Sequence, residues 1–252
     1  MSSPKLSIII PAYQESERIE ETLDKLADYI KKYSLKNIEV VVVVADSPDG
    51  TASIARAKAK LFENFKVVDA GPKVGKGRDV RTGIFEATGD YKLFMDADLA
   101  TPLHHIRAVQ EKIEEGADVI IAVRNLSSIH TGLRKVISAA GNFLVQVMLL
   151  PGIPDSQCGF KAFSKEAANE LFSRQTILGW GFDMEILAIA RMRGYKIAQI
   201  SAPDWSDKPN GTFEGEVKTA ALETLGELFT IVWRKWRGVY KNKHYSYEAY
   251  KK

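Results

Sequence analysis

The feature of this chain that most constrains its fold is an alternation of short apolar runs with amphipathic segments. The run at Ile38–Ala45 (IEVVVVVA) is apolar at nearly every position, which is typical of a strand covered on both faces. When such strands alternate with helices they form βαβ units, and successive units build a parallel sheet with helices on both sides. The sequence therefore predicts an α/β fold with a mostly parallel sheet.

The other elements follow from the same periodicities. The predicted strands are Leu6–Ile10, Ile38–Ala45, Lys66–Asp69, Tyr91–Met95, Val119–Val123, the end of Asp155–Phe163, and Lys196–Ile200. The predicted helices are Glu15–Tyr33, Thr51–Leu61, Arg78–Thr88, Pro102–Glu115, Leu133–Leu150, Lys165–Ser173, Phe182–Arg193 and Glu216–Tyr240. The alternation becomes irregular after Arg124. We expect residues 1–215 to form one domain, and residues 216–252 to add an amphipathic helix and a basic, Tyr-rich tail to the same compact unit.

Composition excludes several classes of protein. The formal net charge of +3 is too small to indicate nucleic-acid binding. The single cysteine, Cys158, excludes an intrachain disulfide and favours a reducing compartment, so a cytoplasmic location is expected. The N-terminal apolar run is too short for a signal peptide, and no segment reaches the roughly 18 apolar residues that a membrane span requires. The chain is not expected to cross a membrane.

Polar motifs follow the predicted strands of the first half. They are PAYQE, DSPDGT, AGPKVGKGR, DADLATP and RN, in chain order. In open parallel sheets, ligands bind outside the carboxyl ends of the strands. Carboxylates, a Gly-Lys-Gly turn and an arginine are therefore expected at one edge of the sheet.

Two of these carboxylates, Asp96 and Asp98, stand one residue apart at the end of a buried strand. Paired acids are costly there unless a cation or a shared proton lies between them. The alternative is an Asp-rich turn that caps the next helix. Because the neighbouring loops bring cations and a Gly-rich turn to the same edge, we favour a site for Mg²⁺ or Mn²⁺ with a phosphorylated ligand.

Zinc is not expected, because the four histidines and the cysteine do not group into ligand spacings. His104 and His105 are expected to point to different faces of a helix and to be ordinary surface residues. Two common phosphate-binding motifs are also excluded. The loop PAYQES replaces the Gly-x-Gly-x-x-Gly of a dinucleotide-binding domain, and GPKVGKGR lacks the hydroxyl residue that ends a P-loop.

Taken together, the motifs resemble the family-2, GT-A-fold glycosyltransferases, and among them the dolichyl- and polyprenyl-phosphate glucose and mannose synthases. SIIIPAYQESERI is similar to the opening strand and loop of that family, with Gln14 in place of Asn. SPDGT, VGKGRDVRTGIFEATGDY and DADLATP are similar to its next motifs, and DSQCGFKAF and GWGFDMEILAIARMRGYKIAQI to its lipid-phosphate branch. The resemblance runs from Leu6 to Thr212. It implies a Rossmann-like sheet with an irregular, acceptor-side C-terminal half.

The resemblance also implies roles for individual residues. Those expected at the nucleotide sugar are Pro11, Tyr13, Glu15, Asp46, Lys76, Asp96 and Ala97. The family usually has two acids before GSPDGT, where this chain has Val44 and Ala45 if no gap is allowed. With a one-residue deletion Asp46 takes the base-contacting place, and we prefer that alignment. The base, uracil or guanine, stays open.

Further roles are implied at the reacting groups. Asp98 would ligate the metal directly, and Asp96 would contact the ribose or bind the metal through water. Arg124 and Arg134 would contact the sugar or the phosphates. Lys208 stands where the family often has an arginine, in a loop that closes over the site. Asp183 lies at the start of a predicted helix, so it either interacts with the helix dipole or takes part directly in the reaction. The same choice applies to Asp155 and Glu185.

The implied reaction is inverting transfer of one hexose from a UDP- or GDP-sugar to a polyprenyl or dolichyl phosphate. A phosphate oxygen is ionised at neutral pH and needs no general base, whereas a hydroxyl acceptor would need one. One alternative is therefore the same fold with a hydroxyl acceptor and Asp183 as base. A second is a catalytically silent nucleotide-sugar-binding scaffold, which the intact Asp-x-Asp motif argues against.

The predicted C-terminal helix is the candidate for contact with a membrane. Its apolar residues repeat at helical spacing and are Leu222, Leu225, Phe229, Val232, Trp233, Trp236 and Tyr240. Basic residues accompany the tryptophans, and they are Arg234, Lys235, Arg237, Lys241 and Lys243. Such a helix either lies on anionic lipid or covers the domain's own core. A peripheral position on the cytoplasmic face, a membrane partner subunit and a homo-oligomer all stay open.

Overall fold

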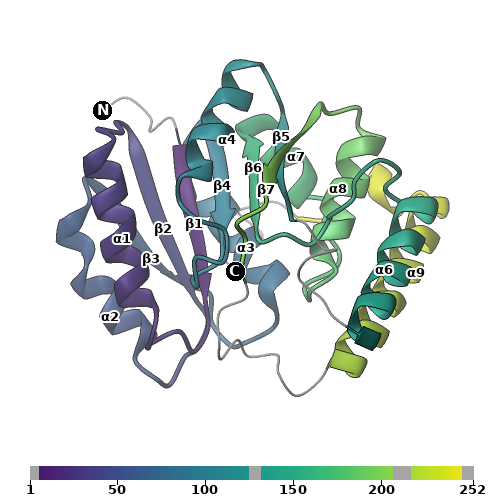
Figure 1. Cartoon of the computed structure of the whole chain (residues 1–252), viewed down its shortest axis with the longest axis horizontal. Helices are drawn as coiled ribbons and strands as arrows, with labels where there is room; N and C mark the ends of the chain where they lie inside the picture. The colour runs from purple at the N-terminus through teal and green to yellow at the C-terminus, as the bar shows by residue number, and fades with distance from the viewer. Residues whose placement is uncertain (1–5, 125–131, 207–216, 246–252) are drawn as a thin grey trace.

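The computed structural model describes residues 6–124, 132–206 and 217–245, with the backbone alone for residues 132–139 and 217–222. Within this part, the strands form one seven-stranded sheet in the order β3-β2-β1-β4-β6-β5-β7 (Figure 1). The strands are β1 (Leu6–Ala12), β2 (Ile38–Val44), β3 (Asn64–Asp69), β4 (Tyr91–Met95), β5 (Val119–Arg124), β6 (Phe160–Ser164) and β7 (Ile197–Ala202). Neighbours pair in parallel, except that β6 is antiparallel to both β4 and β5. The predicted mostly parallel sheet is confirmed.

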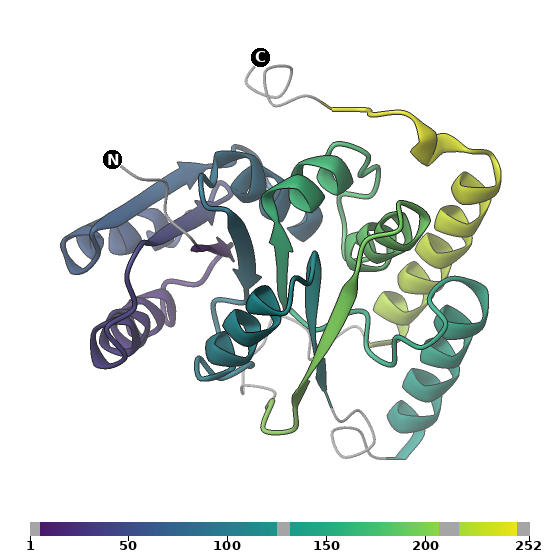
Figure 2. The same cartoon turned by 90° about the horizontal axis from the view of Figure 1, so that it is seen from above.

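Helices cover both faces of the sheet (Figures 1 and 2). They are α1 (Ile19–Lys32), α2 (Thr51–Ala57), α3 (Lys76–Glu86), α4 (His105–Glu114), α6 (Gly132–Met148), α7 (Lys165–Phe172), α8 (Phe182–Met192) and α9 (Val217–Trp236), with 3-10 turns at η1 (Ala59–Leu61) and η2 (Val239–Lys241). Because successive strand residues point to opposite faces, Ile8 and Ile10 pack with α1, α2 and α4. Ile9 packs with α3, α7 and α8. The continuous apolar run of β2 is buried throughout, as its sequence predicts.

Several boundaries differ from the predicted ones. The first helix begins at Ile19 rather than Glu15, because the Glu15 N–H donates to Thr51 Oγ1 of the neighbouring loop at 3.0 Å. The predicted helix Thr51–Leu61 is divided, since the Lys58 N–H donates to Ala55 three residues back and a 3-10 turn follows. The fourth helix begins at His105 rather than Pro102. These shifts lie at element ends and leave the topology unchanged.

The C-terminal helix α9 lies alongside α6, at one end of the sheet (Figures 1 and 2). It contacts α8 through Glu227, whose carboxylate accepts from the Gly181 N–H. Beyond the helix, the Tyr240 hydroxyl donates to Glu185 Oε1 at 2.9 Å. The other oxygen of the buried Glu185 accepts the N–H groups of Thr176 and Ile177. These contacts assign Glu185 to holding Tyr240 of η2 against the body of the protein, and the domain bounds stay a prediction.

The apolar residues of α9 divide between two faces. Leu228 and Ile231 are fully buried and Leu225 and Val232 partly so, in the same cluster as α8. The residues on the other face are exposed: Phe229 by 55%, Trp233 by 56% and Trp236 by 81%. Leu222 lies outside the described side chains, and the other predicted member, Tyr240, is buried. The helix therefore covers the core and also presents a separate aromatic face. No helix in the described residues is long and apolar enough to cross a membrane.

Candidate functional site

The loop after β1 is held by the loop after β2. Asp49 in the SPDGT motif accepts the Ser16 N–H at 3.0 Å, the Thr51 hydroxyl at 2.7 Å and the Ser47 hydroxyl at 2.9 Å. The Gln14 N–H donates to Ser47 Oγ at 2.7 Å, and Gln14 has a left-handed φ of 55°. These hydrogen bonds lower the pKa of Asp49 despite the opposing effect of burial. The motif therefore fixes the backbone on which Tyr13 and Glu15 stand.

Lys76, Asp96 and Asp98 come together beyond the ends of β1 and β4. Lys76 Nζ lies 2.5 Å from Asp96 Oδ1. Burial opposes the charge of Lys76, but Asp96 and Asp183 raise its pKa above the ordinary value. One oxygen of Asp98 accepts the Ala100 N–H at 2.9 Å. Burial and the neighbouring Asp96 raise the pKa of Asp98, and Lys76 and Arg18 offset the shift only in part, so a bound cation would stabilise the ionised carboxylate.

Glu15 approaches the same carboxylates from the end of β1. Burial raises the pKa of Glu15, Arg18 opposes that shift, and Asp98 adds to it. Arg18 Nη1 lies 3.3 Å from the Glu15 carboxylate. Glu15 thus interacts electrostatically with both acids of the Asp-x-Asp motif, and carboxylate oxygens suit a hard cation such as Mg²⁺ or Mn²⁺. Asp98 with Asp96 would hold such an ion.

The Gly-Lys-Gly turn is positioned by close packing against residues 175–182. A side chain at Gly77 would overlap Phe182 and Gln175, and one at Gly75 would overlap the Leu178 backbone. The Gln175 amide donates to the Gly77 carbonyl at 2.9 Å. The glycines therefore permit this approach, and the segment before α8 sets where Lys76 points.

Gly159, the residue before β6, performs a similar function for Asp96. The Asp96 N–H donates to the Gly159 carbonyl at 3.1 Å. A Cβ atom at Gly159 would overlap the Asp96 carboxylate itself. The DSQCGF motif thus makes room for the first acid of Asp-x-Asp.

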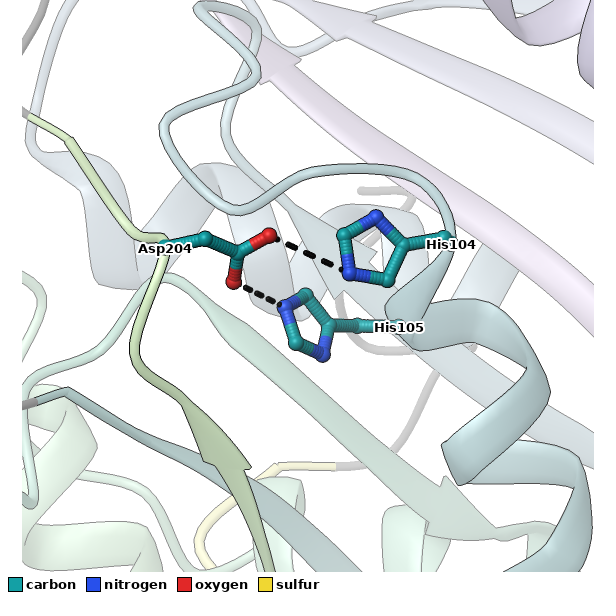
Figure 3. Close-up of side chains that lie close together, drawn as sticks. All are labelled: His104, His105 and Asp204. Carbon is teal, nitrogen blue, oxygen red and sulfur yellow. Dashed lines mark hydrogen bonds and ion pairs between the residues drawn. The ribbon is translucent and has the colours of Figure 1, made fainter.

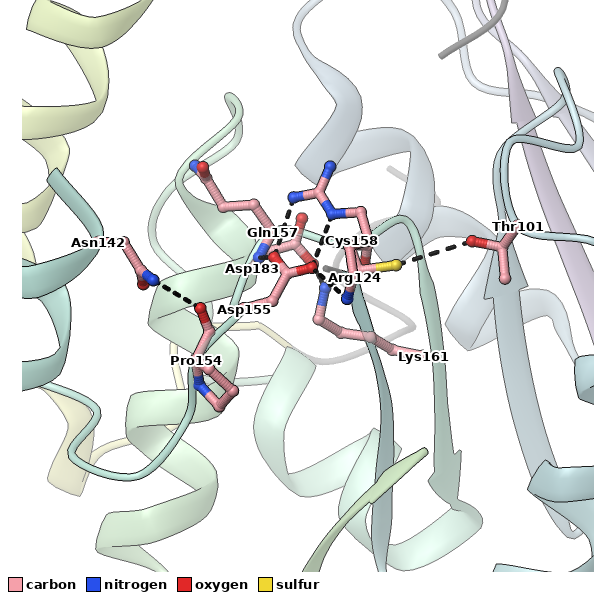
Figure 4. Close-up of polar contacts among 9 residues, drawn as sticks. All are labelled: Thr101, Arg124, Asn142, Pro154, Asp155, Gln157, Cys158, Lys161 and Asp183. Atoms are coloured by element: carbon pink, nitrogen blue, oxygen red, sulfur yellow. Dashed lines mark hydrogen bonds and ion pairs between the residues drawn. The ribbon is translucent and has the colours of Figure 1, made fainter. Parts of the chain in front are cut away.

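Arg124 at the end of β5 is held on both sides. Its guanidinium forms a two-pronged ion pair with the buried Asp155, with Nε to Oδ2 at 2.6 Å and Nη2 to Oδ1 at 2.9 Å (Figure 4). The ring of Trp205 lies 4.8 Å from the guanidinium carbon. Asp155 raises the pKa of Arg124 despite burial, and Arg124 in turn lowers that of Asp155. Bidentate pairing fixes both position and orientation of the guanidinium.

A second buried ion pair joins β6 to α8. Lys161 Nζ lies 2.6 Å from Asp183 Oδ1 and donates to the Cys158 carbonyl at 2.5 Å (Figure 4). Burial raises the pKa of Asp183, while Lys161 and Lys76 oppose the shift. Asp183 thus lies between two lysines at the N-terminus of α8. Cys158 is buried and its thiol contacts Thr101 at 3.7 Å, and burial raises its pKa to about 11.

The expectation for the two histidines is wrong. His104 and His105 do not point to different faces, because both Nε2 atoms reach the carboxylate of Asp204, at 3.1 Å and 2.7 Å (Figure 3). His104 is the N-cap residue of α4 and already has helical backbone angles, with φ of −63° and ψ of −18°. Neighbouring positions at the start of a helix therefore do not keep the two imidazoles apart, because both reach the same carboxylate, and their rings lie side by side with centroids 4.3 Å apart.

The remaining predicted residues lie at the other strand ends or outside the described part. Pro11 and the buried Ala97 lie next to the loops of β1 and β4, and the Tyr13 ring lies 4.1 Å from Lys73 Nζ. Asp46 is exposed after β2, and its N–H donates to Gly71 at 2.8 Å. Lys208 lies outside the described residues, as does the side chain of Arg134.

Three residues that contribute to the site were not among the residues predicted from the sequence. They are Asp49, Gly159 and Lys161. Lys161 carried a readable signal, since a lysine inside the apolar run GFKAF must find a buried partner. Asp49 and Gly159 stood inside recognised motifs, and their roles depend on contacts with distant loops.

Comparisons with solved structures agree with this architecture. Glucosyl-3-phosphoglycerate synthase from Mycobacterium tuberculosis, in complex with UDP, matches 91% of this chain and 80% of its own, with a TM-score of 0.69 and 19% identity. Mannosyl-3-phosphoglycerate synthase from Rubrobacter xylanophilus matches 93% of this chain and 74% of its own, with a TM-score of 0.71 and 18% identity. The predicted fold, that of the GT-A glycosyltransferases, is confirmed.

Sequence comparisons give the family. The family described as "Glycosyl transferase family 2" matches residues 7–172, and the chain belongs to it. It is 32% identical over 216 residues to dolichyl-phosphate beta-glucosyltransferase ALG5D of Trichomonas vaginalis, covering 80% of this chain and 66% of that protein. It is 31% identical over 224 residues to the human dolichyl-phosphate beta-glucosyltransferase, covering 81% and 68%. The chain thus spans about two thirds of the length of these relatives. The predicted class of protein, a family-2 glycosyltransferase, is confirmed.

Proposed function

We propose that this protein transfers glucose, with inversion, from UDP-glucose to a dolichyl or polyprenyl phosphate in a reaction that depends on Mg²⁺ or Mn²⁺. The observation that carries the proposal is the meeting of Lys76 with Asp96 beside Asp98 at the carboxyl end of the sheet. The names of the relatives support glucose and a dolichyl phosphate. A solved neighbour in complex with Mn²⁺ and UDP-glucose supports uracil over guanine and a divalent ion.

Each group of the site has a task in this reaction. A divalent ion held by Asp98 and Asp96 would stabilise the charge on the diphosphate leaving group. Lys76 then offsets phosphate charge, a role that requires it to exchange part of its contact with Asp96 for the ligand. Arg124, fixed by Asp155, presents a cation on the acceptor side. Arg134 and Lys208 belong to the proposal as further cations for the two phosphate groups.

The surroundings of Asp183 favour a phosphate acceptor over a hydroxyl. A general base must reach the proton that it removes, whereas Asp183 is buried and already paired with Lys161. A phosphate oxygen needs no such base. We therefore assign Asp183 to positioning Lys161 and Lys76, and the hydroxyl-acceptor reaction stays the second candidate. A silent scaffold is disfavoured because the acids of Asp-x-Asp and the lysine that faces them are all present.

The decisive experiment presents one donor and one acceptor at a time. Radiolabelled UDP-glucose and GDP-mannose would each be incubated with dolichyl phosphate, with dolichol, and without acceptor, in Mg²⁺ or Mn²⁺. We expect label in the lipid phase only with UDP-glucose and dolichyl phosphate. Transfer to dolichol would establish the hydroxyl-acceptor candidate. Absence of both transfer and donor hydrolysis with every donor would favour the scaffold.

The acceptor of this reaction lies in a bilayer, so we also propose that the aromatic face of α9 contacts the membrane surface. Phe229, Trp233 and Trp236 are exposed on α9, and Phe143 and Val147 are each 64% exposed on the adjacent α6. Basic residues at the C-terminal end of α9 favour anionic lipid. The cytoplasmic face, a membrane partner subunit and a homo-oligomer remain predictions.

Replacing Trp233 and Trp236 with alanine should weaken binding to vesicles that contain anionic lipid by at least about thirtyfold. Full transfer of one tryptophan from water is worth roughly 2 kcal/mol, which alone corresponds to about a thirtyfold change. Co-sedimentation with vesicles of phosphatidylcholine and phosphatidylserine measures the effect, and Leu61→Ala, which removes a 42% exposed apolar residue elsewhere, is the control. If the wild-type chain stays in the supernatant with and without phosphatidylserine, α9 is a structural helix.

A further inference from the structure

We propose that His104, His105 and Asp204 form a second metal site, distinct from the Asp96–Asp98 pair and selective for a borderline transition ion of the Zn²⁺ type. The proposal does not depend on the transfer reaction, because it rests on these three side chains alone. Their ligating atoms all lie within 4.8 Å of one another. They come from segments about 100 residues apart, the start of α4 and the end of β7 (Figure 3).

The geometry already converges on one point. Both imidazoles present Nε2 to a single carboxylate, His104 to Oδ2 at 3.1 Å and His105 to Oδ1 at 2.7 Å. In a tetrahedral site with bonds of about 2.0–2.2 Å, ligand atoms stand about 3.3–3.6 Å apart. Small rotations of the exposed His104 and Asp204 side chains would therefore admit an ion, while the buried His105 supplies a fixed ligand.

The donor set distinguishes this site from the first. Two imidazole nitrogens and one carboxylate suit Zn²⁺, Co²⁺ or Ni²⁺, whereas hard Mg²⁺ prefers oxygen ligands. The first site offers carboxylate oxygens. With three protein ligands the second leaves a coordination position for water. The two sites should therefore differ in metal selectivity. The acids should prefer the hard ion Mg²⁺, and the histidines should prefer the softer ion Zn²⁺.

Binding here would fix the chain that leaves β7. Asp204 is followed by Trp205, which stacks on Arg124, and by Ser206, whose N–H donates to the Ala100 carbonyl at 3.1 Å. Ala100 in turn follows Asp98 and donates its N–H to that carboxylate. An ion at the second site would join α4 to this segment. It would thereby hold the ring of Trp205 in place against the guanidinium of Arg124.

Titration with Co²⁺ tests the proposal directly, because tetrahedral Co²⁺ absorbs visible light. The full chain carrying Asp96→Asn and Asp98→Asn removes the first site and leaves the second. We expect this protein to bind one equivalent of Co²⁺, to release it to Zn²⁺, and to retain it in millimolar Mg²⁺. Adding His104→Ala and His105→Ala should weaken Co²⁺ binding at least about 100-fold, and adding Asp204→Asn at least about tenfold.

Two controls separate loss of ligands from loss of fold. Asp204→Asn keeps the shape of the side chain and one oxygen for His105, so its melting temperature without metal reports any structural damage. His244→Ala removes an imidazole that faces the Val239 carbonyl in the tail, and it should leave Co²⁺ binding unchanged. The proposal is overturned if the double-asparagine protein binds no Co²⁺, or if its binding is unaffected by loss of both histidines. In either case the cluster is a hydrogen-bonded link between α4 and β7.

Discussion

Replacement of Asp98 by alanine is expected to lower the rate of sugar transfer at least about 100-fold, because it removes the ligand that would hold the ion on the leaving diphosphate. Stabilisation of that charge is worth several kcal/mol, and each 1.4 kcal/mol corresponds to a factor of ten. The fold should survive, since burial and Asp96 make the ionised carboxylate unfavourable in the native protein. Transfer rates over a range of Mn²⁺ concentrations, together with melting temperature, measure both effects.

The matched control is Asp28→Asn, which neutralises an exposed acid on α1. It should leave both the rate and its dependence on Mn²⁺ unchanged. A rate for Asp98→Ala above about a tenth of wild type, equivalent to less than roughly 1.4 kcal/mol, would contradict the assignment of Asp98 as a metal ligand.

Gly159→Ala is expected to lower transfer at least about tenfold although it changes no charged group. The added methyl group would occupy the position of the Asp96 carboxylate, which would have to turn away from Lys76. Crowding of this kind also costs about 1–3 kcal/mol of folding free energy, so urea unfolding should show a lower midpoint. Gly141→Ala places the same methyl group in open space on α6 and should behave like wild type.

A double-mutant cycle identifies the cause of that loss. If the effect of Gly159→Ala acts through Asp96, then adding it to Asp96→Ala should lower transfer no further, because the group that it displaces is already gone. Independent, additive losses would mean that Gly159 serves a different function, such as closing the turn before β6.

The parallel half of the sheet could be predicted because each of its strands carries a local signal. Ile38–Ala45 indicated a strand buried on both faces, and β2 is buried throughout. Strand β6 gave no comparable signal of direction. Its antiparallel insertion between β4 and β5 depends on long-range pairing, which no local period encodes. The ends of α1 and α4 were misplaced because hydrogen bonds from another loop, or a turn at the N-terminus, fix where those helices begin.

The positions of the candidate residues in the fold were predictable to the level of strand ends. Lys76 follows β3 while Asp96 and Asp98 follow β4, and the structure brings them together although two strands lie between β3 and β4. The partners of Arg124 and Asp183 were not predictable, because Asp155 lies in the segment before the inserted strand β6 and Lys161 lies on that strand. The same limit explains the histidines. Helical spacing did not show that His104 and His105 share a partner, because that partner, Asp204, lies far along the chain.

The order of the strands has a consequence for how the chain matures during synthesis. Strands β3, β2, β1 and β4 can form a continuous sheet as soon as residue 95 has left the ribosome. Strand β5 then has no place beside β4 until β6 is made, and β6 begins at Phe160, 36 positions after β5 ends at Arg124. At roughly 5–20 residues per second this interval lasts about 2–7 s. During it the nascent protein carries an open, apolar edge at β4 and an unpaired β5, the kind of exposed strand that invites aggregation. Slow translation or chaperone binding between residues 124 and 160 would therefore influence the yield of folded protein more than the same events elsewhere.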